Sequence, residues 1–319
     1  YWGENSKIPF QQQQSLTESL IADLENIRQK CRTDMVVTDE LANMYEDENL
    51  EEVVDTKFYE CVKTISNKCS EMMLCFAERV IEECVKILSQ KPPCEFQAVA
   101  IGSLAKGEAT PYSDLEFLFL LEKRTAANEE YFEILAITTY FVIGNLRETK
   151  LSYMAIEELQ GWFDDQAKNG FKIDGLSLGA GNIPTGNGVN QMKNCFIITP
   201  DDLAAVYEEV LENPKEEALR GDLTAMLTYT QPFYSTPHGG KLVEVLRAKI
   251  KKIHPNDSRI EVNRKMLRTD AEKFSFEPNA EFFNEGLNAN VKKELYRFPS
   301  IILMDISIIL GHTKKSSWE

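Results

Sequence analysis

The sequence predicts an α+β protein, in which N-terminal helices precede a small mixed β-sheet and a helical bundle follows it. Helical periodicity dominates residues 15–90 and returns from about residue 199. Short, β-prone apolar runs separated by turn-forming residues lie between these two stretches. We therefore expect an N-terminal helical region at 1–94, a sheet-containing domain at 95–200 and a C-terminal helical domain at 201–319.

The N-terminal region is expected to begin with a polar arm. Residues 1–14 end in a run of glutamines, which is typical of a linker. The spacing of Ser15 and Glu18 matches a capping box and predicts a helix start there. A long amphipathic helix is expected from about Asp55 to Leu88, and the Pro92-Pro93 pair that follows ends it.

The central region predicts a sheet with one crossover helix. Four runs are predicted as strands, at Phe96–Ile101, Leu115–Leu121, Phe171–Leu178 and Cys195–Ile198. The turn-rich segment Gly102–Ser113 has room for one or two helical turns, and Asn128–Asn145 has the pattern of a helix. Thr199 is a suitable N-cap for the next helix, with Pro200 at its first position. Later helices are expected at about Lys215–Tyr229, Lys241–Ile253, Arg259–Phe274 and Ala289–Leu310.

Composition narrows the expected partners and compartment. The net charge of −16 disfavours long nucleic acid, because an acidic surface repels phosphate polymers. Small nucleotides stay compatible with it, since a bound divalent cation supplies positive charge. The seven cysteines have no C-x-x-C spacing, as expected of reduced thiols in a cytoplasmic protein. The apolar run Phe298–Leu310 is interrupted by Asp305 and is too short for a membrane span, so no membrane contact is expected. Tyr1 in place of a methionine indicates a piece of a longer protein or a processed chain.

Two carboxylates and a Gly-Ser pair form the most informative pattern in the chain. Asp114 and Glu116 are two residues apart on a predicted strand, so both side chains are expected on one face. Two like charges side by side are best tolerated around a cation, and Mg²⁺, with Mn²⁺ as an alternative, prefers carboxylate oxygens. Gly102 and Ser103 follow the preceding strand, where a glycine allows close approach of a phosphate and N–H and hydroxyl groups bind its oxygens. Together these groups suit attack on the α-phosphate of a nucleoside triphosphate.

The segment Gly102–Glu116 resembles the DNA polymerase beta-like nucleotidyltransferase superfamily. The resemblance rests on Gly-Ser followed by Ser-Asp-Leu-Glu at this spacing. The run Gly-Glu-x-x-x-Tyr-Ser-Asp at 107–114 is closest to one branch. That branch holds the PII-protein uridylyltransferases, the glutamine synthetase adenylyltransferases and related nucleotidyltransferases. The resemblance implies an Mg²⁺-dependent, uridylyl- or adenylyltransferase-like enzyme that binds ATP or another nucleoside triphosphate. It also implies transfer of a nucleotide monophosphate to an acceptor hydroxyl, with a protein side chain as the expected acceptor.

The resemblance also implies a third carboxylate, at Asp174. With Asp114 and Glu116, this residue would complete the catalytic and metal-binding set and accept the proton of the attacking hydroxyl. An ordinary aspartate at a strand end before Gly175 is the alternative. Two departures from the branch are visible in the sequence. Glu116 stands where many relatives carry Asp, and Ser177 stands where relatives often carry arginine.

Further nucleotide contacts are expected from basic residues and one serine. Lys106 lies where it could reach the triphosphate, although a solvated lysine is equally consistent with the sequence. Ser113 is either a nucleotide contact or a residue that positions Asp114. Lys293 and Arg297 share a helix face. The resemblance implies that they face the phosphates, and a plain surface patch is the alternative.

Two alternative functions stay open. One is a catalytically weak nucleotide-sensing or protein-interaction module, which the departures at Glu116 and near Asp174 favour. The other is a nucleotidyltransferase that acts on a small molecule.

Overall fold

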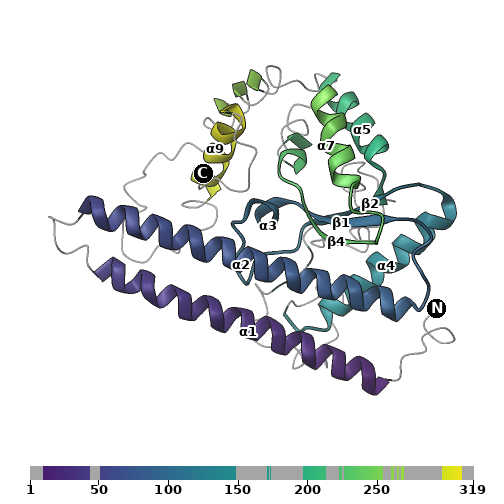
Figure 1. The fold of residues 1–319 in the computed structure, drawn as a ribbon, viewed down its shortest axis with the longest axis horizontal. Helices are drawn as coiled ribbons and strands as arrows, with labels where there is room; N and C mark the ends of the chain where they lie inside the picture. Colours follow the sequence, from purple (N-terminus) through teal and green to yellow (C-terminus); the bar gives the residue numbers. More distant parts are fainter. Residues whose placement is uncertain are drawn as a thin grey trace, which may run out of the picture. The chain divides into compact units, whose positions relative to one another are not determined.

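The structure is a computed structural model. It confirms the predicted α+β class, with a small mixed sheet among several helices (Figure 1). It describes residues 10–43, 51–148, 171, 173, 197–212, 223–224, 226–253, 260–261, 264–265, 267–268 and 297–310. The chain divides into two compact units, Tyr1–Leu203 with Thr230–Leu246, and Ala204–Tyr229 with Arg247–Glu319. The first unit carries the sheet and its flanking helices. The three-region division with boundaries after residues 94 and 200 stays a prediction.

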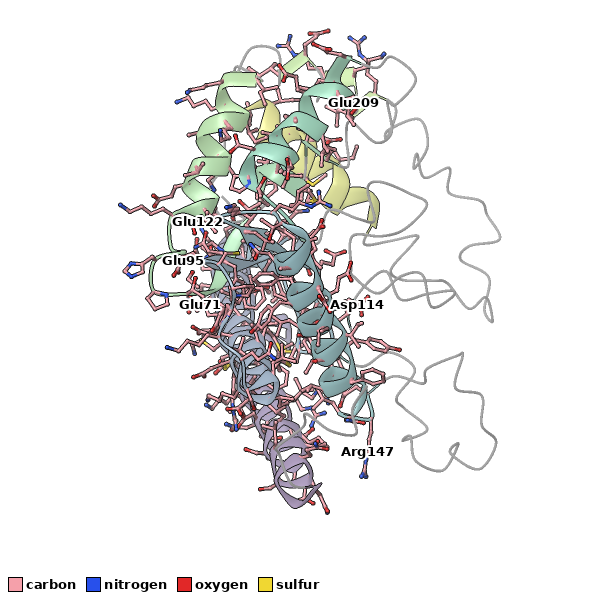
Figure 2. All side chains as sticks on the ribbon, turned by 90° about the vertical axis from the view of Figure 1, so that its right-hand side faces the viewer. Glu71, Glu95, Asp114, Glu122, Arg147 and Glu209 are labelled. Carbon is pink, nitrogen blue, oxygen red and sulfur yellow. The ribbon has the colours of Figure 1, made fainter. Side chains whose placement is uncertain are left out.

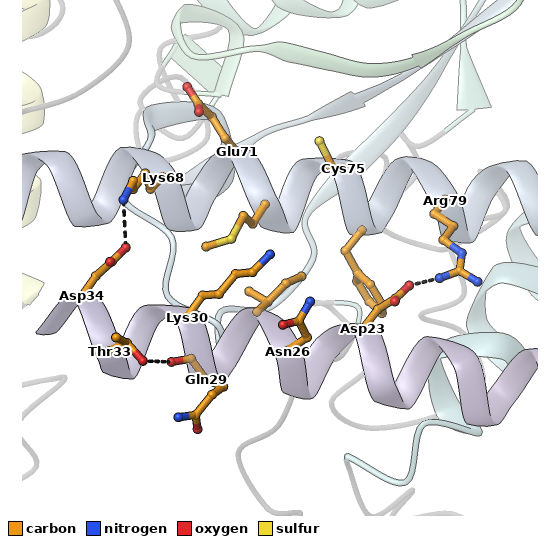
Figure 3. Close-up of a pocket in the computed structure, with 13 residues that line it drawn as sticks. Asp23, Asn26, Gln29, Lys30, Thr33, Asp34, Lys68, Glu71, Cys75 and Arg79 are labelled. Atoms are coloured by element: carbon orange, nitrogen blue, oxygen red, sulfur yellow. Dashed lines mark hydrogen bonds and ion pairs between the residues drawn. The ribbon is translucent and has the colours of Figure 1, made fainter.

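Two long helices, α1 (Phe10–Asn43) and α2 (Glu51–Leu88), pack side by side in the first unit (Figure 1). Buried residues repeat along α1 at helical spacing, at Leu20, Leu24, Ile27 and Cys31. The matching residues of α2 are Cys69, Met73, Phe76, Ala77, Val80, Ile81 and Cys84. Ion pairs cross-link the two helices at two places (Figure 3). Lys68 lies 3.1 Å from Asp34, and Arg79 pairs with Asp23.

The predicted start of the first helix at Ser15 is wrong. Helix α1 already begins at Phe10, so the capping-box reading of Ser15 and Glu18 does not hold. The Gln14 side chain instead donates a hydrogen bond to Glu18 Oε1 over 3.0 Å, one turn along the same helix. Glutamine is a good helix former, which explains why the glutamine run extends the helix and does not form an arm. The second long helix is confirmed and ends at Leu88 as expected.

Within the described residues, the sheet has four strands in the order β3-β2-β1-β4. Their bounds are β1 (Phe96–Ala100), β2 (Phe117–Leu121), β3 (Ile197–Ile198) and β4 (Gln231–Ser235). Strand β1 is antiparallel to both neighbours, β2 and β4, whereas β2 and β3 are parallel. The register pairs Phe96 with Leu121 and Ala100 with Phe117. The ends of β1 and β2 nearest Ile101 and Glu116 therefore lie together, and this end carries the predicted site.

Strand β4 was not predicted from the sequence. It lies at the edge of the sheet, and its pairing with β1 shifts register between Ala98 and Val99. Pro232 is paired with Val99 beside this irregularity. A proline has no N–H to donate and is tolerated in a strand only at edges and bulges, so the pattern at 231–235 is not typical of a strand.

Helix α4 (Ala126–Gly144) covers one face of the sheet and is confirmed close to its predicted bounds. Thr125 caps it by accepting a hydrogen bond from the backbone N–H of Asn128. Phe132 of α4 packs against Phe96 and Phe119, with ring centroids 4.9 and 5.8 Å apart. Helix α2 contributes to the same apolar core.

Among the described residues, helices α5 (Pro200–Glu212), α7 (Leu242–Ile253) and α9 (Arg297–Ile309) come later in the chain. The predicted N-cap is confirmed, because Thr199 Oγ1 accepts from the backbone N–H of Asp202 over 3.1 Å. In the predicted strand at 171–178, Phe171 and Ile173 are described, and Ile173 forms an isolated parallel bridge with Leu115. Within the described part of the chain, no helix combines the length and the apolar character that a membrane crossing requires.

Candidate active site

Gly102 and Glu116 meet where strand β1 passes into α3 (Gly102–Lys106). Gly102 has a φ of +63°, in the left-handed region that favours glycine. A Cβ added to it would lie 1.5 Å from Glu116 Oε2 and 2.8 Å from Glu116 Cδ. The Glu116 carboxylate therefore fills the space that the missing side chain leaves. The structure thus shows the Glu116 carboxylate beside Gly102, and a phosphate contact at Gly102 stays a prediction.

The backbone around Glu116 is fixed by the β1–β2 ladder. The Glu116 carbonyl accepts a hydrogen bond of 2.9 Å from the N–H of Ile101, which continues the antiparallel pairing one step beyond the strands. Burial alternates along this stretch: Leu115 and Phe117 are buried, whereas Asp114 and Glu116 are half-buried. This alternation is expected of extended backbone that turns Asp114 and Glu116 away from the core. Figure 2 shows Glu95 and Glu122 together on one side and Asp114 on the other, in agreement with the strand register.

The loop between α3 and Asp114 is anchored to helix α2. Gly107 ends α3 in the left-handed conformation, with φ of 73°. Two residues later, the backbone N–H of Ala109 donates a 2.9 Å hydrogen bond to the buried hydroxyl of Ser70. Helix α2 therefore fixes the position of the loop just after α3.

Ser113 holds a turn in this loop. Its Oγ accepts from the backbone N–H of Thr110 over 2.8 Å, and its own N–H donates to the Thr110 carbonyl over 3.0 Å. These bonds close the turn immediately before Asp114. They support a positioning role for Ser113, and a nucleotide contact by its hydroxyl stays a prediction.

Helix α1 also contacts this loop, which sequence reasoning missed. The Arg28 guanidinium lies over the Tyr112 ring at 4.4 Å from the centroid, and Arg32 donates to the Tyr112 hydroxyl over 3.1 Å. Arg28 also pairs with Glu148, just beyond α4. The sequence separations are too large for a local pattern to reveal such contacts. A basic residue on the apolar stripe of α1, one position after the buried Ile27, was the available signal.

The other predicted residues are placed as follows. Ser103 is half-buried in the first turn of α3, and Lys106 is half-buried in its last turn. Asp174 and Lys293 lie outside the described residues. Arg297 begins α9 in the second unit, and its side chain is not among those described.

Residues 81–161 match the family model described as a nucleotidyltransferase domain. This stretch is similar to nucleotidyltransferase domains. The matched stretch includes β1, α3, the loop to Asp114, β2 and α4, and it supports nucleotidyl transfer from a nucleoside triphosphate as the general activity. Among curated proteins, none matches the chain.

The donors in this nucleotidyltransferase domain fit a hard divalent cation. Asp114 and Glu116 offer carboxylate oxygens, the ligands that Mg²⁺ prefers, and Glu116 is held against the start of α3 in the space above Gly102. Across the described residues, His, Cys, Asp and Glu side chains do not gather in groups of three or more that could hold a metal ion. Asp174, the expected third ligand, is outside that set, so the fit rests on the pair.

Proposed function

We propose that this chain is an Mg²⁺-dependent nucleotidyltransferase, uridylyl- or adenylyltransferase-like, with a hydroxyl of a protein side chain as its acceptor. One observation carries the proposal. Inside the matched nucleotidyltransferase domain, Glu116 lies against Gly102 at the start of α3, and Asp114 is two residues away on the same ladder end. Glu116 and the start of α3 are thus adjacent in the fold, and Asp114 is two residues from Glu116 in the chain.

Asp174 is proposed as the third carboxylate. The residue before it in the chain, Ile173, forms a backbone bridge with Leu115. Leu115 stands between Asp114 and Glu116 in the chain, so the bridge holds the residue before Asp174 beside the segment that carries the other two proposed carboxylates. This supports the set that the sequence predicted for catalysis and metal binding.

The proposed reaction is an in-line substitution at the α-phosphorus. Gly102, Ser103 and Lys106 bind the β- and γ-phosphate oxygens, and Asp114, Glu116 and Asp174 hold Mg²⁺ or Mn²⁺. When bound there, the cation would neutralise charge on the phosphate oxygens. Asp174 accepts the proton of the acceptor hydroxyl, whose oxygen forms the new bond to phosphorus. The bond from the α-phosphorus to its bridging oxygen breaks, and pyrophosphate leaves.

Label transfer tests this proposal. The protein is incubated with each of the four α-³²P-labelled ribonucleoside triphosphates, with Mg²⁺ or Mn²⁺, and with whole-protein and small-molecule acceptor fractions. The proposal expects label from one triphosphate on a protein band, release of pyrophosphate, and loss of both with Asp114→Asn. Label on a small molecule alone would point to the alternative acceptor class. Absence of transfer from all four, with nucleotide binding intact, would favour a nucleotide-sensing module.

A further inference from the structure

We propose that Arg28 of helix α1 is a positioning residue for this active site, which it serves by holding Tyr112 and the chain that leads to Asp114. The inference rests on the proposed function and adds a residue from outside the matched domain. It makes α1 a functional part of the catalytic unit.

The first contact holds the ring of Tyr112 on two sides. The Arg28 guanidinium carbon is 4.4 Å from the ring centroid, a geometry in which the cation is attracted to the ring face. Arg32, one turn further along α1, donates to the Tyr112 hydroxyl over 3.1 Å. Helix α1 thus fixes both the face and the tip of a side chain two residues before Asp114.

The second contact of Arg28 is with Glu148, just beyond α4. Arg28 Nη1 donates to Glu148 Oε1 over 2.9 Å, and Nη2 bonds the other oxygen of the same carboxylate. Such a two-pronged bond is specific to the planar arginine group. Glu148 Oε2 also accepts from the backbone N–H of Phe171 over 3.2 Å. Phe171 is two residues before Ile173, which bridges Leu115. One guanidinium therefore joins the loop before Asp114 to the segment that leads to Asp174.

Packing of α1 against the core does not by itself explain why Arg28 is buried. The apolar residues Leu20, Leu24 and Ile27 already provide the buried side of α1. The Arg28 side chain is only 9% exposed, and its Nε atom is buried with no hydrogen-bond partner among the described residues. An apolar residue would avoid that desolvation penalty, since replacing a buried charge network by well-packed apolar groups is often neutral or stabilising. A role in orienting Tyr112 and Glu148 accounts for a charged group here.

The test compares Arg28→Lys with Arg79→Lys. Lysine keeps the charge at 28 but loses the two-pronged bond and the flat stacking surface. Arg79 is a matched control, because it is also a helical arginine in an ion pair, here with Asp23 of α1 (Figure 3). It also donates to Ser19 Oγ over 2.8 Å, so its described partners lie on α1 and not in the loop at 107–116. We expect Arg28→Lys to speed amide hydrogen exchange in peptides covering 107–116 by roughly tenfold, while Arg79→Lys leaves those peptides unchanged.

Steady-state kinetics give the second measurement. Misplacement of Asp114 is expected to lower kcat by roughly 10- to 100-fold in Arg28→Lys, with the KM for the triphosphate changed less than about threefold. The losses in Arg28→Lys and Tyr112→Ala should not add in the double variant, since both break the same contact. If Arg28→Lys does not fold, Arg32→Gln is the second variant, because Arg32 is exposed and donates to the Tyr112 hydroxyl. Hydrogen exchange at 107–116 then tests whether α1 holds Tyr112.

The outcomes separate the two proposals. Unchanged exchange at 107–116 in Arg28→Lys, or equal kcat losses in Arg28→Lys and Arg79→Lys, would overturn the positioning role. Wild-type protein without any transfer activity would overturn the proposed function instead, and hydrogen exchange would still decide whether Arg28 holds the loop.

Discussion

At Gly102, one backbone angle and one missing side chain decide where the Glu116 carboxylate lies. The Gly-Ser pair and the Asp-Leu-Glu run could be predicted as neighbours from their spacing. Their actual contact could not, because it depends on a φ of +63° and on a long side chain folding back over the glycine. For Arg28, the only signal in the sequence was a basic residue on the apolar stripe of α1, and its partners Tyr112 and Glu148 could not be predicted because they are distant in the chain.

Gly102→Ala is expected to expel Glu116 from its place. The added methyl would meet Glu116 Oε2 at 1.5 Å and would force a left-handed backbone on alanine, which costs about 1–2 kcal/mol. We predict a lower melting temperature and loss of the thermal shift produced by Mg²⁺ with a triphosphate. Gly240→Ala is the control, since a Cβ there meets nothing within 4 Å and should leave both measurements unchanged. A Gly102→Ala protein with a normal ligand-induced shift would show that the contact with Glu116 is dispensable.

Cys84 is predicted to resist alkylation in the folded protein. Burial is the main cause that raises the pKa of its thiol to about 12. At pH 8 the reactive thiolate is then only about 10⁻⁴ of the population. Folding raises the pKa of this thiol, so the neutral thiol is favoured in the folded protein. Its contribution to the free energy of unfolding is fully present below the unfolded pKa near 9 and is lost as the pH rises toward 12. Mass spectrometry after iodoacetamide treatment at pH 8 should find label on the exposed Cys75 first. Equal labelling of Cys84 in native protein would contradict its burial.

Among the elements, the helices were the most predictable and the sheet edges the least. Periodicity placed the second long helix and α4 within a few residues, because each buries a continuous apolar stripe. The edge strand β4 escaped notice, since Pro232 and the register shift beside it give no period-two pattern. The start of α1 was also missed, because a glutamine run has the composition of a linker and the propensity of a helix.

The Gln97 side chain links β1 to β4 and to the part of α7 that belongs to the first unit. It is 2% exposed in β1, donates to Ser235 Oγ of β4 over 3.0 Å and accepts from the backbone N–H of Val243 in α7 over 2.8 Å. Gln97→Met keeps the size but leaves a buried N–H without its acceptor, so we expect a loss of about 1–3 kcal/mol in the free energy of unfolding. Urea denaturation measures it, and Gln90→Met at an exposed position is the control. No difference between the two variants would contradict the linking role.

At the scale of the whole molecule, the two units hold different parts of the prediction. Asp114 and Glu116 belong to the unit with the sheet, whereas Lys293 and Arg297 belong to the unit of Arg247–Glu319. The general class, a nucleotidyltransferase domain, followed from a motif of about fifteen residues and agrees with the family match at 81–161. The nucleotide base and the acceptor could not be predicted from the sequence. Both would be recognised by surfaces built from distant parts of the chain, which no local motif defines.

The most direct test of the central claim is isothermal calorimetry of Mg²⁺ with a non-hydrolysable triphosphate. Wild-type protein is compared with Asp114→Asn, Glu116→Gln and Glu122→Gln. Glu122 is an exposed carboxylate at the opposite end of β2, so its variant changes the charge equally away from the site (Figure 2). We predict metal-dependent binding that weakens at least about tenfold, or about 1.4 kcal/mol, in the first two variants and persists in Glu122→Gln. Binding that is independent of the metal, or unchanged in Asp114→Asn and Glu116→Gln, would contradict a metal-nucleotide site at these carboxylates.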